Sequence, residues 1–384
     1  MNASGPNTYR VLLPYTETPN IKKRFTVEYT VEAADRRAAL VEAEKEFYAY
    51  TRYNSASWVR MLQPEGIRIW RLMPDLPQTP ASIDALVENL AQSDTDVLYN
   101  TLRALGDLED QTAARAVAGL MNHSDAEIAA LAVETLGRLG DVGYVDDILS
   151  RFDDKATARM RACVLSALGR LGKVEHTRLQ DVLSRALGDD DTRVRANAVE
   201  LVERLQLPDA PRVLVPLMGD EDNRVRANVL KALWNSHDRE TLVTALEEMV
   251  KASNHWMRAS AAFVLRYLDV ENRYALVGRL LRDSDAEVRA SAVKTLMVLD
   301  DVEQVVPLLV EVQAERSGEF GEQITNRMLA LGSVGWARLL SWQPPSPKAD
   351  QVRRDWMKRI EDAVHGRDGH IAWMKMNLRR WLGR

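Results

Sequence analysis

One phrase of the sequence is written twice, 31 residues apart, and this repetition limits what the chain can fold into. The two copies are GDDDTRVRANAVELV at residues 188–202 and GDEDNRVRANVLKAL at residues 219–233. The skeleton of the phrase recurs in eight stretches, which begin at residues 93, 124, 156, 190, 221, 253, 284 and 319. A period of this length predicts a stack of repeated units rather than one globular core.

The spacing of apolar residues within each repeated unit predicts a pair of helices. Within the phrase, Val194, Ala198 and Leu201 follow at steps of four and three, which places them on one buried stripe of a helix. A shorter apolar run with helical spacing precedes each phrase, as in LQDVLSRAL at residues 179–187. Acidic residues between the two runs are typical helix caps. One such pair cannot bury its own apolar face, whereas stacked pairs can.

The pattern D-x-x-V-R-x-x-A-x-x-A-L-G-x-L-G resembles the HEAT repeat, in the short form found in phycobilisome-lyase-like proteins. The resemblance covers roughly residues 84–332. It implies that the Asp and Arg of successive units stack along the solenoid and have a structural role. The matching stacking positions are Asp191, Arg195, Asp222, Arg226, Arg258, Asp285 and Arg289.

The expected fold class is mainly α, an α-solenoid of about eight HEAT-like helix pairs with a different segment at each end. Alternating and apolar runs predict a small α+β (ββαββ) module over residues 1–73, with one helix near 35–50. A Pro-rich linker is expected at 74–83 and the HEAT-repeat solenoid at 84–342. Residues 343–384 are expected to form a basic, Trp-rich C-terminal helical cap, with helices near 350–365 and 369–382.

Composition and motifs argue against several classes of protein. The single cysteine, Cys163, leaves no disulfide framework and no Cys metal cluster. We expect a cytoplasmic protein, because no apolar run approaches a membrane span and the first residues lack the pattern of a signal peptide. No phosphate-binding loop, nucleophile elbow or dinucleotide fingerprint occurs, and the six histidines lack metal-ligand spacing. We therefore expect a non-enzymatic protein with no catalytic residues, metal or cofactor.

The remaining candidate for function is a surface. In HEAT-like solenoids the outward face of the second helix lines the concave side, which here means positions 3, 7, 10 and 14 of each phrase, counted from zero. The sixth phrase places three aromatic residues on this face, where its neighbours are polar, and aromatic residues beside Arg are typical of binding hot spots. The alternative is that the C-terminal helices bury these aromatics, or that the assigned face is one position off. The predicted partner-binding residues are Trp256, Phe263, Tyr267, Arg193, Arg224, Asn228 and Lys231.

Charge is distributed unevenly along the chain. Residues 333–384 carry 11 basic and 5 acidic side chains, whereas residues 81–332 carry 29 basic and 42 acidic ones. Basic helices with Trp can lie on an anionic membrane or bind an acidic partner. An exposed solenoid end also needs a cap, and we favour the cap, with membrane-surface contact as the alternative.

Three classes of function therefore compete. The first, which we favour, is a non-enzymatic scaffold or adaptor that binds a protein or peptide partner in the concave groove. The second is a bilin lyase-like protein or a chaperone of chromophore proteins, which the repeat subtype alone suggests. The third is nucleic-acid binding through basic groove or C-terminal residues, which the acidic solenoid opposes.

Overall fold

The N-terminal module is a small sheet with one helix against it, as the sequence predicts. In the computed structural model, which describes residues 7–17, 24–54, 60–73, 83–172, 174, 176–315 and 320–365, its elements are β1 (Asn7–Glu17), β2 (Arg24–Ala33), α1 (Arg36–Asn54), β3 (Arg60–Leu62) and β4 (Arg68–Arg71). β1 lies in the middle and pairs antiparallel with β2 on one side and with β3 and β4 on the other. Apolar residues of β1 and α1 form the core of the module.

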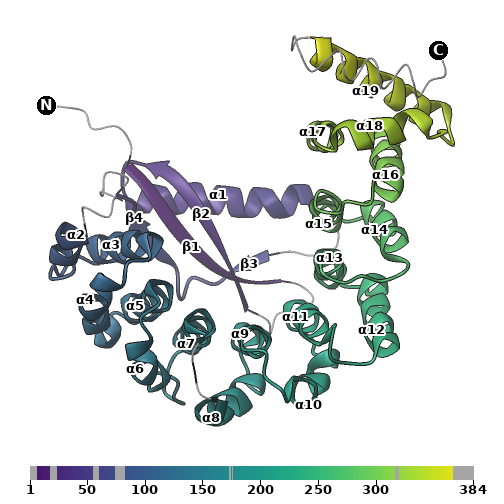
Figure 1. Cartoon of the computed structure of the whole chain (residues 1–384). Helices are drawn as coiled ribbons and strands as arrows, with labels where there is room; N and C mark the ends of the chain where they lie inside the picture. Colours follow the sequence, from purple (N-terminus) through teal and green to yellow (C-terminus); the bar gives the residue numbers. More distant parts are fainter. Residues whose placement is uncertain are drawn as a thin grey trace, which may run out of the picture. The chain divides into compact units, whose positions relative to one another are not determined.

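The chain divides into two compact units, Met1–Leu233 and Trp234–Arg384. The first contains the N-terminal module and five helix pairs, whose second helices curve around the sheet while the first helices form an outer row (Figure 1). The second helices are α3 (Thr95–Leu108), α5 (Ala126–Leu139), α7 (Ala158–Leu171), α9 (Thr192–Arg204) and α11 (Asn223–Leu233). The first helices are α2 (Ile83–Asn89), α4 (Ala114–Gly119), α6 (Val145–Leu149), α8 (His176–Leu187) and α10 (Ala210–Leu214), with 3-10 turns η2 (Gln111–Ala113), η3 (Leu120–Asn122), η4 (Val142–Tyr144) and η5 (Val215–Gly219) beside them.

The second unit contains three further helix pairs. Their first helices are α12 (Arg239–Lys251), α14 (Arg273–Leu281) and α16 (Val302–Glu315), and their second helices are α13 (His255–Val264), α15 (Ala286–Leu296) and α17 (Gly321–Ala330). With the five pairs of the first unit they give the eight predicted pairs, so the mainly α fold class is confirmed. The linker predicted at 74–83 lies outside the described residues except for its last residue.

The repeated phrase forms the helix that the sequence predicts, for two local reasons. Its apolar stripe is fully buried, since Val194 and Ala198 have no exposed surface and Leu201 is 1% exposed. Successive second helices also approach closely. A Cβ on Gly137 would lie 2.5 Å from the Cα of Ala167, so α5 and α7 can be this close only because residue 137 is Gly.

The N-terminal module joins the first repeat through β4 and α3. Trp70 stacks on Tyr99 with 4.4 Å between ring centroids, and both rings are buried. The Asn100 amide donates to the Arg71 carbonyl oxygen at 2.8 Å, and the Asp96 carboxylate receives the Arg36 guanidinium at 2.6 Å. Asp96 and Asn100 occupy positions 3 and 7 of the first phrase, so β4 covers the face that other phrases present to a neighbouring repeat. The module therefore acts as the N-terminal cap of the first unit.

The second unit ends in α18 (Gly332–Ser341) and α19 (Pro347–His365). Trp356 of α19 is 3% exposed, and its indole nitrogen donates to the Thr325 hydroxyl at 3.2 Å. This part of the predicted C-terminal segment packs on the last repeat, which is what a cap does. The second expected helix, at 369–382, lies outside the described residues.

Candidate partner-binding surface

A ladder of Arg–Asp pairs joins successive repeats. Arg195 donates two hydrogen bonds to the carboxylate of Asp220, from Nε at 2.8 Å and from Nη2 at 2.9 Å, and its Nη1 donates to the Asp189 carbonyl at 2.7 Å. The same arrangement recurs between Arg161 and Asp189, and between Arg258 and Asp283. Each guanidinium thus binds the turn of the following repeat and the start of its own helix. This geometry gives the ladder a structural role.

The structure corrects which carboxylates take part in the ladder. Asp191, Asp222 and Asp285 cap their own helices, since their side chains accept from backbone amides two residues later. The ladder carboxylate is the one two residues before the cap, as in Asp220 and Asp283. The Oδ1 atom of this carboxylate, which accepts from the arginine Nη2, also accepts the backbone amide of the cap residue, and this fixes the turn around both carboxylates.

Arg289 makes the same helix-start contacts, since it is 8% exposed and donates to the carbonyls of Asp283 and Ser284. One of the predicted stacking arginines, Arg226, deviates from the ladder geometry. The Nε of Arg226 is buried without a hydrogen-bond partner among the described residues. In the pairs Arg195–Asp220 and Arg258–Asp283 the Asp follows the Arg by 25 residues. The residue 25 positions after Arg226 is Lys251. The sequence therefore lacks the carboxylate that this spacing would supply.

Position 7 of the phrase joins repeats instead of lining a groove. Asn197, Asn228 and Ser291 each donate to a backbone carbonyl of the preceding second helix, at 2.9, 3.3 and 2.8 Å. Asn228 is 7% exposed and also donates to Glu200 at 3.0 Å, so it is not available to a partner as predicted. A small polar residue recurring at one position of the phrase was the signal for this role, and sequence reasoning missed it.

The other predicted residues of repeats four and five remain at the surface, where carboxylates pair with them. Arg224 contacts Glu200 of the preceding repeat at 2.7 Å, and Lys231 contacts Glu203 at 3.0 Å. Arg193 is exposed and pairs with its own cap Asp191 at 2.8 Å. These cations and carboxylates largely balance one another, so this face carries little excess charge.

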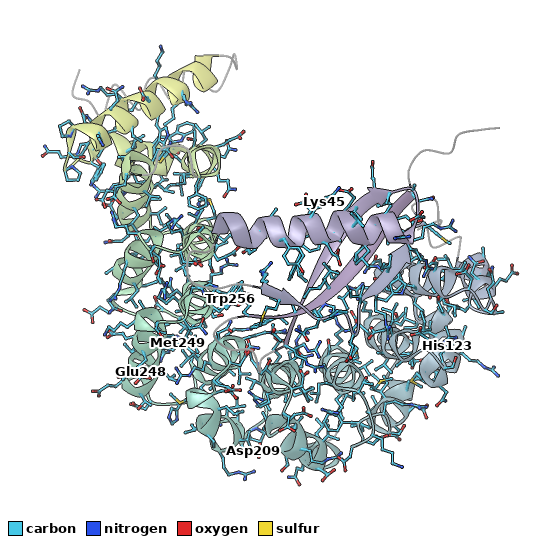
Figure 2. The ribbon with its side chains drawn as sticks, turned by 180° about the vertical axis from the view of Figure 1, so that it is seen from behind. Lys45, His123, Asp209, Glu248, Met249 and Trp256 are labelled. Carbon is cyan, nitrogen blue, oxygen red and sulfur yellow. The ribbon has the colours of Figure 1, made fainter. Side chains whose placement is uncertain are left out.

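The corresponding face of repeat six, in the second unit, carries exposed aromatic rings, whereas position 14 is the one apolar position on this face of repeat seven. Phe263 is 38% exposed and Tyr267 is 49% exposed, with 5.5 Å between their ring centroids. Arg266 lies over the Phe263 ring at 4.8 Å, and Val298, at position 14 of the seventh phrase, is 53% exposed. Trp256, labelled in Figure 2, lies in the first turn of α13 and is partly buried. Its ring lies at a tilt on the His255 ring, with 4.6 Å between the centroids. We call Phe263, Tyr267 and Val298 the aromatic patch.

The single thiol does not provide a nucleophile. Cys163, at position 7 of the third phrase, is 2% exposed, and burial raises the pKa of its thiol to about 12. A thiol with this pKa is protonated at neutral pH, and only the thiolate attacks or binds a metal. Cys163 therefore behaves as a small core residue.

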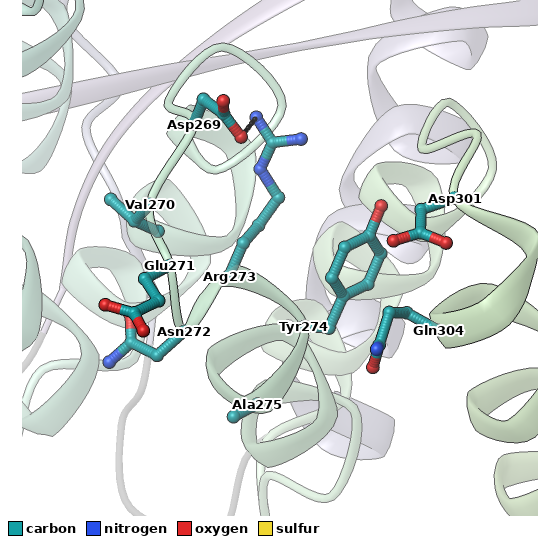
Figure 3. Close-up of a pocket in the computed structure, with 9 residues that line it drawn as sticks. All are labelled: Asp269, Val270, Glu271, Asn272, Arg273, Tyr274, Ala275, Asp301 and Gln304. Carbon is teal, nitrogen blue, oxygen red and sulfur yellow. Dashed lines mark ion pairs between the residues drawn. The ribbon is translucent and has the colours of Figure 1, made fainter.

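A hollow lies at the turn between α13 and α14, with a volume of about 610 Å³ (Figure 3). Arg273 lies on one side, 3.6 Å from Asp269, while its Nε donates to the Leu268 carbonyl at 2.7 Å. Tyr274 lies on the other side with Asp301, and burial followed by the charge of Asp301 raises the pKa of its hydroxyl. Its nine lining residues include no Ser, Thr, Cys, Lys or His.

Two features are absent from the described residues. No group of three or more His, Cys, Asp or Glu side chains is arranged to hold a metal ion. No helix in the same part of the chain has the length and apolar character needed to cross a bilayer.

The helix pairs define a class of protein, the α-helical repeat proteins, and the sequence comparison gives the family. A family model of HEAT repeats matches residues 83–169, 159–234 and 179–266. The chain therefore contains HEAT repeats over residues 83–266, and the predicted resemblance is confirmed. A search of curated proteins gives no significant match to the sequence.

Several solved structures are similar to this chain at low identity. The complex of CpcE and CpcF of phycocyanin lyase from Nostoc is 16% identical with a TM-score of 0.42, over 67% of this chain and 100% of that one. Human deoxyhypusine hydroxylase is 15% identical with a TM-score of 0.31, over 73% and 96%. Kap121p bound to Pho4p is 12% identical with a TM-score of 0.44, over 68% and 34%. Similarities this distant do not say what this chain binds.

Proposed function

We propose that this protein is a non-enzymatic scaffold that binds a protein or peptide partner through the aromatic patch of repeats six and seven. The observation that carries the proposal is the exposure of Phe263 and Tyr267 at positions 10 and 14 of the sixth phrase and of Val298 at position 14 of the seventh. A cluster of exposed apolar side chains on a repeat protein marks a site of interaction, because without a partner it promotes aggregation.

The chemistry around the patch supports a protein partner. Aromatic rings next to Arg266 provide large apolar contact area together with a cation, the composition of interface hot spots. In repeats four and five, Arg224 and Lys231 are already paired with carboxylates. Phosphate binding needs cations in excess, so these paired cations oppose a nucleic-acid ligand.

The proposal includes the absence of catalysis and a cytoplasmic location. Support for the first comes from the buried, protonated Cys163 and from the hollow beside Arg273, whose lining residues include no Ser, Thr, Cys, Lys or His. Support for the second comes from the cysteine content, since a chain with one cysteine has no internal disulfide framework.

The test begins with capture of the partner from the source cell, identified by mass spectrometry. Isothermal titration calorimetry then compares the wild type with the double variant Phe263→Ala/Tyr267→Ala. We expect the dissociation constant to rise at least about 30-fold, which corresponds to roughly 2 kcal/mol for hot-spot residues. Circular dichroism should show an unchanged helical spectrum.

Val334→Ala is the matched control, because Val334 is 64% exposed on α18, away from the phrase positions. This variant should bind with the affinity of the wild type. Equal binding by the double variant and the wild type would reject the aromatic patch as the binding site.

A further inference from the structure

The second strand of the N-terminal module has an open edge. β2 is ten residues long, contains no proline and pairs with β1 in an uninterrupted register from Arg24 to Ala33. Within the described residues no strand pairs with its other side. Native proteins usually protect an edge strand by making it short or by adding a bulge or a proline. β2 has none of these protections.

The apolar row of β2 is less buried than the matching row of β1. In β1, Tyr9, Val11, Leu13 and Tyr15 are between 0% and 5% exposed. The corresponding residues of β2, which pack against the same core, are only partly buried. The row of β2 has a neighbouring strand on one side only, and another strand beside it would complete its burial. These β2 residues are Phe25, Val27, Tyr29 and Val31.

The sequence of β2 is complementary to itself in an antiparallel pairing centred on Glu28. In this register Arg24 stands opposite Glu32, Thr26 opposite Thr30, Val27 opposite Tyr29 and Phe25 opposite Val31, each of them twice by symmetry. Opposite charges, paired threonines and an aromatic ring opposite a β-branched residue are the cross-strand pairs that stabilise sheets. Arg24, Thr26, Thr30 and Glu32 are all exposed, so they are available for these pairs.

The one unfavourable pair in this register is Glu28 opposite its own copy. Glu28 already forms an ion pair with Arg10 of β1 in the same chain. Two Arg10 side chains would therefore accompany the two Glu28 side chains at the centre. The like-charge repulsion is partly neutralised before the strands meet.

We propose that two copies of this chain dimerise by antiparallel pairing of β2 with β2, centred on Glu28. The pairing joins the two four-stranded sheets into one continuous sheet and does not involve the aromatic patch. The dimer would thus present two partner-binding surfaces, which increases the avidity for a partner with two matching sites.

Charge reversal at the ends of β2 tests the register. Within one chain Arg24 stands opposite Thr16 and Glu32 opposite Thr8, so neither residue has a charged partner directly across the β1–β2 ladder. The two are eight residues apart on one strand, about 26 Å, too far to interact directly. Arg24→Glu alone, or Glu32→Arg alone, should therefore weaken the dimer at least tenfold in sedimentation equilibrium. The double swap Arg24→Glu/Glu32→Arg should restore the wild-type dissociation constant.

Disulfide trapping tests the centre of the pairing. Glu28→Cys places two thiols directly opposite each other, and the native Cys163 is 2% exposed and stays silent. Mild oxidation should convert this variant to a covalent dimer, while Lys45→Cys, on the exposed face of α1 (Figure 2), should remain monomeric in denaturing gels. A wild type that is monomeric at about 100 μM would overturn the proposal. A double swap that stays as weak as the single variants would overturn the register.

Discussion

Two rows of ion pairs cross from repeat to repeat, and they differ in burial. In the ladder, the side chains of Arg195 and Asp220 are 11% and 6% exposed. On the surface of the second helices, the side chains of Arg224 and Glu200 are 53% and 32% exposed. The buried row recurs at fixed positions of the phrase, whereas the exposed row changes from repeat to repeat and gives way to rings at Phe263 and Tyr267. The phrase thus fixes the spacing of the repeats and leaves the outer positions free to vary.

The largest effect is expected where the buried row is cut. Arg195→Ala leaves the Asp220 carboxylate buried without its guanidinium, and breaking a buried pair in this way costs about 3–5 kcal/mol of stability. Thermal and urea unfolding of the full chain would measure this loss. A change below about 1 kcal/mol, the range of exposed pairs, would remove the distinction between the two rows.

Arg226→Ala serves as the control for this experiment. Arg226 occupies the same position of the phrase as Arg195, but its Nε has no hydrogen-bond partner among the described residues. The substitution removes no carboxylate contact of the ladder type, so we expect a distinctly smaller loss than for Arg195→Ala. Equal losses would show that the stem of the arginine, rather than the Asp contact, carries the stability.

Much of the architecture could be predicted because the phrase is repeated. A buried stripe such as Val194, Ala198 and Leu201 and the capping acids define each second helix, and eight copies confirm one another. The strands of the N-terminal module alternate apolar and polar residues, which is an equally local signal. These features depend on neighbours within one helix or strand, so the sequence alone carries them.

The contacts between repeats could not be predicted in the same way. Whether Arg195 contacts Asp220 or Asp222 depends on the path of a turn in the next repeat, and the resemblance indicated the wrong member of the pair. Asn228 was assigned to a groove because its position on the helix faces outward, yet the previous helix lies against it. In the N-terminal module, Arg60 is 5% exposed, and its guanidinium lies over the rings of Tyr15 and Tyr50. Sequence alone would place an arginine at the surface, because arginines are mostly exposed in proteins.

A second, smaller effect is expected at the edge of the aromatic patch. Trp256 is partly buried, unlike Tyr267, so Trp256→Ala should lower both partner affinity and stability, the latter by less than the roughly 3–5 kcal/mol of a core Trp. Tyr267→Ala should lower affinity with little change in stability. Calorimetric binding and thermal unfolding of both variants would separate the roles. A full core-sized loss for Trp256→Ala would place that ring outside the binding surface.

The two kinds of carboxylate should also respond oppositely to acid. Burial alone would raise the pKa of Asp283, but its hydrogen bonds to Arg258 and the Asp285 amide lower it. Its stabilising contribution is therefore complete above its unfolded pKa of about 3.9 and is lost as the pH falls through the lower folded value. Burial raises the pKa of Glu287 on the second-helix surface, so stability linked to Glu287 increases as the pH falls through the raised folded value and levels off below the unfolded value of about 4.3. Melting curves of Asp283→Asn and Glu287→Gln between pH 3 and 6 should deviate from wild type in opposite directions.

The smallest effect is expected for the exposed row. Arg224→Ala removes the 2.7 Å contact with Glu200, but an exposed pair of this kind contributes only about 0.2–1 kcal/mol and is weakened further by salt. Unfolding at low and at high ionic strength should therefore show a small difference from wild type that shrinks with added salt. If Arg224→Ala instead reduced partner affinity as strongly as the aromatic variants, the binding surface would extend into repeat five. A cation that contributes little to the fold would then be kept for a carboxylate of the partner, in exchange for the Glu200 that it contacts in the free protein.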